Sequence, residues 1–148
     1  MNASCRTAKH RNELAKMLET GLTYSTSVLV DETNTAATVG SGELPVFATP
    51  MLLALAEACC CGCLKGQLEA GMTSVGTQVN LSHTAATPVG MTVTCTCELT
   101  EIDGRRLVFR VTMSDEAGEV GHGTHERFLV GKERFMEKAE KKRTQIGK

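Results

Sequence analysis

Glu57 is the only charged residue in a stretch of nineteen residues, 46–64, that is otherwise almost entirely apolar. A carboxylate among apolar side chains loses its hydration, so it must find hydrogen-bonding partners or take up a proton. Such a carboxylate can act as a general base or as a nucleophile. The alternative is structural: the acid lies at the one hydrated edge of a helix, or backbone donors satisfy it.

Two further side chains could join Glu57 in acid–base or acyl-transfer chemistry. His83 falls on the apolar face of an alternating segment, residues 75–83, directly before the break TAATP. Its imidazole can exchange protons near neutral pH, although a lone inward histidine is also common as a satisfied core residue. Thr49 precedes Pro50, where its hydroxyl can cap a helix or help bind an oxyanion at the positive end of the helix dipole.

The remaining histidines and cysteines do not have the spacing of a metal site. His122 and His125 are three positions apart on an expected strand, so we expect them on opposite faces. Cys60 and Cys63 form a C-x-x-C pair, but no second pair follows at a spacing typical of zinc sites. We therefore expect the cysteines of residues 59–63 to act as small packing residues beside the sheet.

The apolar stretch predicts a long central helix. Thr49 is its expected N-cap and Pro50 its first helical residue. The helix is expected to run to about Gln67, with Gly66 and Gly71 marking its end. Because nearly every face is apolar, we expect other elements to enclose it.

Strand patterns lie on both sides of this helix in the sequence. Residues 22–31 predict a first strand, and the turn composition of 32–45 predicts a loop. After the helix the period changes to two, and the expected inward residues of two strands are Val75, Thr77, Val79, Leu81 and His83, then Met91, Val93, Cys95, Cys97 and Leu99. Asp103-Gly104 predicts a hairpin. Two more strands and a short basic helix or tail are expected to follow.

This order of elements indicates an α+β layout. An antiparallel sheet of about five strands wrapped around one long central helix is the hotdog fold. We expect residues 1–20 to form an amino-terminal arm or short helix. Residues 21–148 are expected to form a single domain, which is large enough to bury a core.

Composition narrows the class of protein. Apolar residues make up 41% and charged residues 22%, which is ordinary for a soluble globular protein. The net charge of −1 gives no support for nucleic-acid binding. An odd number of cysteines, seven, is a poor disulfide framework and favours the reducing cytoplasm. We expect neither a signal peptide nor a membrane span, because the opening is polar and the longest apolar run is too short.

Several motifs together resemble the fluoroacetyl-CoA thioesterase family of hotdog proteins. They are VFATP with Glu57, GTQVNLSHTAATPVGMTVTCTCEL, DGRRL and GHGTHER, and the likeness covers roughly residues 22–140. The resemblance implies a catalytic set of Thr49, Glu57 and His83. It also implies three substrate-binding positions: Gly76, whose backbone N–H would meet the acyl group, Phe47, and Arg127 in a supporting role.

The same resemblance implies a homodimer with the site near the subunit interface, and CoA as part of the substrate with no metal or bound cofactor. One feature of the family differs in this chain. The fluoroacetyl-specific enzyme has phenylalanines that close over the substrate, where this chain has Gly40 and Glu43 in TVGSGELPVF. We therefore expect an acyl-CoA thioesterase whose preference for a fluorinated acyl group is not implied.

Thioester hydrolysis could follow two routes. Glu57 could attack the carbonyl carbon to form a mixed anhydride that water resolves, or it could act as general base on a water. The alternatives to this enzyme are a non-catalytic acyl-CoA-binding module and another hotdog chemistry such as enoyl-CoA hydration. Candidate cations for the CoA phosphates are Lys65, Arg105, Arg106 and the basic C-terminal segment.

Helix geometry limits how these groups can meet. Thr49 and Glu57 are eight residues apart, so their Cα atoms should lie about 12 Å apart in a regular helix. We therefore expect the site to be completed across a dimer interface or bridged by the substrate. A dimer would also cover an unpaired edge of the sheet.

Overall fold

The structure, a computed structural model, describes residues 18–146. The arm or helix expected for residues 1–20 lies almost wholly outside the described residues. The strands are β1 (Thr23–Leu29), β2 (Met72–His83), β3 (Thr92–Asp103), β4 (Arg106–Asp115) and β5 (Gly118–Gly131). The helices are α2 (Ala36–Val39), α3 (Thr49–Leu64) and α4 (Lys132–Ile146).

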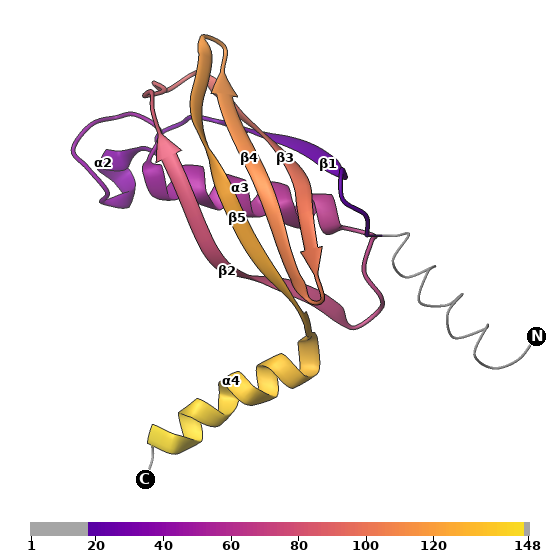
Figure 1. Cartoon of the computed structure of the whole chain (residues 1–148). Coiled ribbons are helices and arrows are strands. Elements are labelled where there is room, and N and C mark those ends of the chain that lie inside the picture. Colours follow the sequence, from indigo (N-terminus) through magenta and orange to yellow (C-terminus); the bar gives the residue numbers. More distant parts are fainter. Residues whose placement is uncertain (1–17, 147–148) are drawn as a thin grey trace, which may run out of the picture.

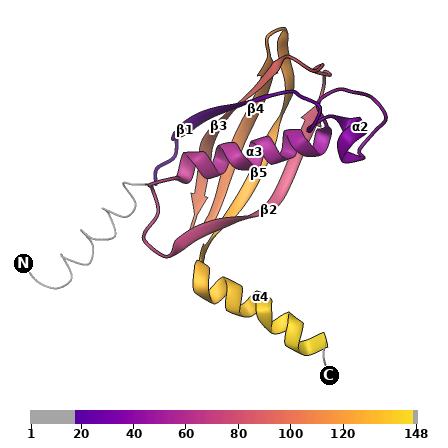
Figure 2. The ribbon, with the colours of Figure 1, turned by 180° about the vertical axis from the view of Figure 1, so that it is seen from behind.

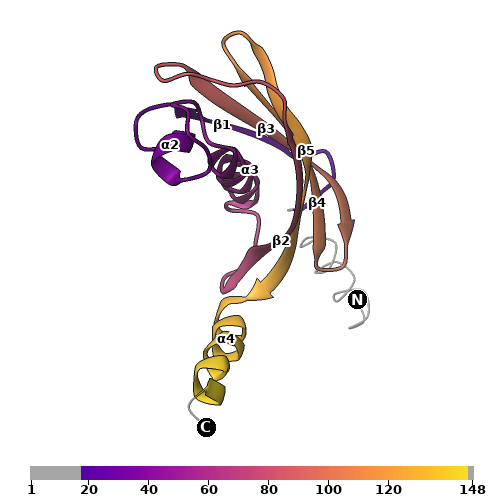
Figure 3. The same cartoon turned by 90° about the vertical axis from the view of Figure 1, so that its left-hand side faces the viewer.

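The five strands form one antiparallel sheet in the order β1-β3-β4-β5-β2. The sheet curves, and α3 lies along its concave side (Figures 1 and 3). This arrangement confirms the predicted α+β layout, in which a sheet of five strands wraps around one long helix. The hairpin expected at Asp103-Gly104 is present, because Asp103 pairs with Arg106 and Gly104 has a positive φ of 59°.

The core fills the space between α3 and the sheet. The alternation predicted for β3 is confirmed, since Val93, Cys95, Cys97 and Leu99 are all fully buried. The cysteines of α3 that face the sheet are buried with them, namely Cys59, Cys60 and Cys63. In the described part of the chain no group of three or more His, Cys, Asp or Glu side chains is arranged to hold a metal ion.

The prediction that other elements enclose α3 is wrong for the single chain. The side of the helix turned away from the sheet is uncovered by any described element (Figure 2). Ala54, Ala58 and Cys61 are exposed there, and Glu57 is partly exposed. The all-round apolar character of the helix therefore leaves a face of small apolar residues open to solvent.

The start of α3 also differs from the prediction. The N-cap is Ala48, Thr49 is the first helical residue, and no side chain caps the helix. The Thr49 hydroxyl is therefore not used as a cap. The segment expected to be a loop contains the short helix α2, which Thr35 caps and Gly40 ends at φ 81°.

A β-bulge in β2 changes which residues of this strand face α3. The pairing of β2 with β5 shifts between Gly76 and Gln78, so Thr77 is an extra residue in the ladder. Such a residue reverses the side-chain alternation. Val79, Leu81 and His83 are partly buried as predicted, whereas Thr77 is exposed and Gly76 faces Glu57 on α3.

The C-terminal segment is a helix, α4, which projects away from the sheet (Figures 1 and 3). This confirms the helical form of the predicted basic helix or tail. No helix within residues 18–146 combines the length and the apolar character needed to cross a membrane.

Candidate active site

Thr49 and His83 form a hydrogen-bonded pair. Thr49 is the first residue of α3 and His83 the last residue of β2, and their Oγ1 and Nδ1 atoms are 2.8 Å apart. The chain before Thr49 is fixed by backbone hydrogen bonds, from Phe47 N–H to Thr87 O and from Ala48 N–H to Asn34 O. These bonds fix the backbone before Thr49, and pairing with Gly121 of β5 fixes the backbone at His83.

A cavity of about 280 Å³ opens beside this pair. Its lining includes Thr49, His83 and the buried Phe47, and also small residues: Ala36, Ser41, Ala85 and Ala86. A concave space that is lined by both apolar and polar groups can hold a small molecule. Its size suits a short acyl group.

Burial sets the protonation of His83. It lowers the pKa of the imidazole, and the nearby Ala85 backbone opposes this in part. Nε2 is buried and has no hydrogen-bond partner within the described residues. A neutral His83 therefore has one ring nitrogen bonded to Thr49, and the other is buried without a partner among the described residues.

Glu57 lies on the same helix, in a second polar cluster. Its Oε2 is 3.2 Å from Nη1 of Arg127, and its side chain is 40% exposed. Arg127 is almost fully buried and donates to Ser74, from Nε to Oγ at 2.7 Å and from Nη2 to the backbone O at 3.0 Å. The guanidinium is thus held in one orientation and directs one N–H at the carboxylate.

His125, for which the sequence predicts no role in a site, completes this cluster. It is fully buried, and its Nδ1 lies 2.8 Å from the carbonyl oxygen of Gln78, so Nδ1 carries the proton. Its Nε2 accepts from Arg127 Nη1 at 3.1 Å and lies 4.0 Å from Glu57 Oε2. Burial, more than the nearby Arg127 charge, lowers the pKa of His125 and keeps it neutral. The sequence pattern that could have identified His125 is its i, i+2 spacing from Arg127, because this spacing places both side chains on one face of the strand.

Gly76 makes room for the Glu57 carboxylate. A Cβ atom at this position would lie 2.6 Å from Glu57 Oε2 and 3.2 Å from His125 Cε1. The carboxylate could not stay in place beside any other residue type. The expected role of Gly76 as a backbone donor to the acyl group stays a prediction.

The six residues predicted from the sequence thus fall into two groups. Thr49, His83 and Phe47 lie together at the start of α3, whereas Glu57, Gly76 and Arg127 lie together about two turns farther along. Within the described residues, no hydrogen bond or ion pair joins the two groups. The prediction that His122 and His125 lie on opposite faces is confirmed, since His122 is exposed and His125 is fully buried.

Comparison with known proteins gives this arrangement a family. The family model described as fluoroacetyl-CoA-specific thioesterase matches residues 30–133. The fluoroacetyl-CoA thioesterase of Streptantibioticus cattleyicolor is 46% identical over 101 residues, which are 68% of this chain and 73% of that protein.

Solved structures agree with this match. A threonine-to-serine variant of the fluoroacetyl-CoA thioesterase FlK, in complex with acetyl-CoA, is 35% identical and superposes with a TM-score of 0.81 over 84% of this chain and 98% of that one. A hot-dog-like protein from Thermanaerovibrio acidaminovorans is 20% identical, with a TM-score of 0.80 over 88% and 96% of the two chains. The second likeness shows the fold alone, and that fold is the predicted one.

Proposed function

The chain belongs to the fluoroacetyl-CoA-specific thioesterase family of thioester hydrolases, and from this premise we propose that it hydrolyses short acyl-CoA esters to the free acid and CoA. The observation that carries the proposal is the pair of preformed groups described above. One is a neutral His83 bonded to Thr49 beside a cavity, and the other is a carboxylate, Glu57, held by a buried Arg127. Together they contain the base, the proton carrier and the hydroxyl donor that acyl transfer needs.

In the proposed reaction Glu57 supplies the attacking oxygen or the base. Either its carboxylate attacks the thioester carbonyl and water then resolves the mixed anhydride, or it deprotonates the attacking water. The Thr49 hydroxyl and the Gly76 N–H would donate to the developing oxyanion, and the proton released by the water would pass through His83 to the departing CoA thiolate. These groups need no metal or bound cofactor, and CoA enters only as part of the substrate.

We propose that a homodimer completes the site, so that Glu57 of one chain meets Thr49 and His83 of the other. Within one chain the helix holds Thr49 and Glu57 about 12 Å apart. Two surfaces support association: β2 is a twelve-residue strand at the edge of the sheet, and α3 leaves its row of small apolar residues uncovered. Pairing two β2 edges would satisfy their free backbone groups and cover these helix faces.

The cavity supports a short acyl group without a requirement for fluorine. Gly40 ends α2, and Glu43 is exposed in the segment that follows. Neither position supplies an aromatic side chain to close over the cavity. We expect acetyl-CoA and slightly longer esters to be hydrolysed at rates similar to that of fluoroacetyl-CoA.

A cytoplasmic location fits the chemistry of the chain. The six cysteines of the described residues are free thiols, and the reducing cytoplasm preserves thiols. Acyl-CoA esters as substrates agree with that compartment.

Measurement of free-thiol release tests the proposed function. The wild type should release CoA from a panel of short acyl-CoA esters, and Glu57→Gln should lower kcat by on the order of a thousandfold while the ester still binds. An ester that binds to the wild type and is never hydrolysed would mean that this chain is a binding module. Loss of a substrate double bond without thiol release would instead indicate hydration of an enoyl ester.

A further inference from the structure

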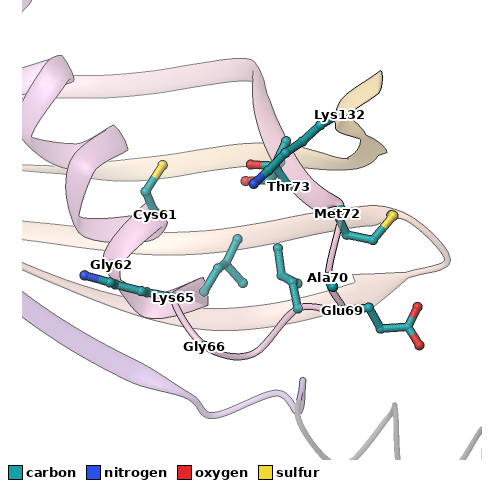
Figure 4. A pocket seen from close by; sticks show the side chains of 13 residues that line it. Cys61, Gly62, Lys65, Gly66, Glu69, Ala70, Met72, Thr73 and Lys132 are labelled. Atoms are coloured by element: carbon teal, nitrogen blue, oxygen red, sulfur yellow. The ribbon is translucent and has the colours of Figure 1, made fainter. Parts of the chain in front are cut away.

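A cavity lies at the far end of α3, beyond the Glu57 cluster (Figure 4). Its volume is about 490 Å³, and it is formed by the end of α3, the turn that follows, the start of β2 and the first residue of α4. Cys61, Lys65, Thr73 and Lys132 are among its lining residues. The proposed reaction uses none of these four side chains.

The cavity is positively charged on balance. Lys65 and Lys132 contribute two positive charges and Glu69 one negative charge, which leaves a balance of one positive charge. Neither lysine forms an ion pair within the described residues. Two ammonium groups without carboxylate partners are available to an external anion.

Figure 4 shows how the two lysines lie. Lys132 extends from the start of α4 back toward Thr73, at the start of β2. Lys65 runs along the end of α3. Both are exposed, so neither side chain is held by packing and a change of rotamer can bring either ammonium group to a bound anion.

This cavity is connected to the candidate active site through Ser74. Ser74 lines the cavity, and it also accepts from Arg127, which holds Glu57. Glu57 and Cys61 are four residues apart on one face of α3, and Lys65 follows four residues later as the first residue after the helix. Lys65 is therefore about 12 Å along the helix axis from the carboxylate.

We propose that this cavity binds the phosphate groups of the CoA portion of the substrate, through Lys65 and Lys132. CoA carries its phosphates at the far end of the long pantetheine arm, so their binding site must lie at a distance from the reacting thioester. This cavity meets the requirement, because it is positively charged, lies about 12 Å along the α3 axis from Glu57 and shares Ser74 with the Glu57 cluster. The inference rests on the proposed function, because it assigns a second part of the same substrate.

Equilibrium binding of CoA to the full-length protein tests the proposal without a need for catalysis. By titration calorimetry, Lys65→Ala/Lys132→Ala should weaken CoA binding by on the order of tenfold or more, because two charge-assisted contacts are lost. Glu69→Gln should strengthen it, because it removes the one acid of the cavity. Arg110→Ala is the matched control, since this exposed cation lies on β4, outside the cavity, and pairs with Glu98, and its affinity should equal that of the wild type.

Truncated ligands separate the phosphates from the rest of CoA. Pantetheine, which lacks the nucleotide, should bind equally well to all four proteins. The same comparison with 3′-dephospho-CoA identifies which phosphate is bound. If the lysine variant binds this ligand as well as the wild type does, the cavity binds the 3′-phosphate. If the variant still binds it more weakly, the cavity binds the pyrophosphate. As a second readout, CoA should slow alkylation of Cys61, the exposed cysteine of the described residues, as followed by peptide mass analysis.

The results distinguish this inference from the proposed function. If the lysine variant binds CoA as the wild type does while the wild type hydrolyses acyl-CoA, the cavity assignment is wrong and the function stands. If CoA binding depends on the lysines but no ester is hydrolysed, the cavity assignment stands and the function is wrong. If the wild type does not bind CoA at all, both are overturned.

Discussion

At the scale of single residues, Arg127 and His125 decide how Glu57 is presented. Arg127 Nη1 lies between Glu57 Oε2, at 3.2 Å, and His125 Nε2, at 3.1 Å, and Ser74 occupies its other nitrogens. A neutral imidazole accepts from the guanidinium, whereas an imidazolium would repel it. Glu57 Oε2 is thus occupied, and Oε1 is the oxygen that can face a thioester or a water.

Replacement of Gly76 should test this arrangement. In Gly76→Ala the new Cβ would meet Glu57 Oε2 at 2.6 Å, so the carboxylate must move. We expect kcat/KM for acyl-CoA to fall on the order of a hundredfold, since displacement of a reacting group by about 1 Å has that effect. Steady-state thiol release measures the loss, and thermal unfolding shows whether the fold is kept.

Gly131→Ala is the matched control for this variant. A Cβ at Gly131 meets no atom within 4 Å, and its φ is not positive. Its activity should equal that of the wild type. If Gly76→Ala were as active as Gly131→Ala, Glu57 would not need its present position, and the assignment of Glu57 as the reacting carboxylate would be wrong.

At the scale of elements, α3 positions two reacting groups with one segment of chain. Its first residue bonds His83 at the end of β2, and Glu57, eight residues later, meets residues of β2 and β5. Because the helix is rigid, it keeps these groups a fixed distance apart. The Thr49 hydroxyl is directed at His83 and not at the helix backbone.

Because the Thr49 hydroxyl bonds His83 and does not cap the helix, its removal should lower activity more than stability. Thr49→Val keeps the shape of the side chain and removes the hydroxyl, whereas Thr49→Ser keeps the hydroxyl. If Thr49 were the cap, Thr49→Val would cost about 1 kcal/mol and several degrees of Tm. We expect a smaller change in Tm and a fall in kcat on the order of a hundredfold, with Thr49→Ser nearer to the wild type. A large drop in Tm with kcat unchanged would show a capping role only.

The elements themselves could be predicted from the sequence where local patterns determine them. The alternation through Val93, Cys95, Cys97 and Leu99 and the Asp103-Gly104 turn are local signals, and both predictions are confirmed. The bulge at Thr77 is not local, since it depends on the register between β2 and β5. The alternation predicted through Val75 and Thr77 therefore failed at the point where Gly76 faces Glu57.

The contacts of the site were harder to predict than the elements. Glu57 was recognised as exceptional because it is alone among apolar residues, but its partners Arg127 and His125 are about seventy positions away in the sequence. Only the pairing of β2 with β5 brings them beneath α3. The open face of α3 could not be predicted either, because apolar residues look alike whether this chain or a second one covers them.

At the scale of the whole molecule, buried histidine links stability to pH. Burial lowers the folded-state pKa of His125, so the unfolded chain binds a proton more readily than the folded one. The stability that neutral His125 contributes is complete above its unfolded pKa of about 6.5 and is lost as pH falls toward the folded value. Chemical denaturation at several pH values should show the free energy of unfolding falling below about pH 6.5.

His125→Asn isolates this contribution. The Asn amide can still donate to the Gln78 carbonyl oxygen but does not titrate. The free energy of unfolding should fall more steeply with acid in the wild type than in the variant, by at most about 1.4 kcal/mol per pH unit. Parallel pH profiles for the two proteins would contradict a neutral, buried His125.

The most direct test of the whole account is the activity of a mixed dimer. Co-expression with two different tags allows purification of dimers in which one chain carries Glu57→Gln and the other His83→Ala. If each site takes Glu57 from one chain and His83 from the other, one of the two sites is intact, and the mixed dimer should show about half the wild-type kcat. Both parent homodimers should be inactive. A mixed dimer as inactive as its parents would show that each site uses Glu57 and His83 of the same chain, and this result would contradict the account.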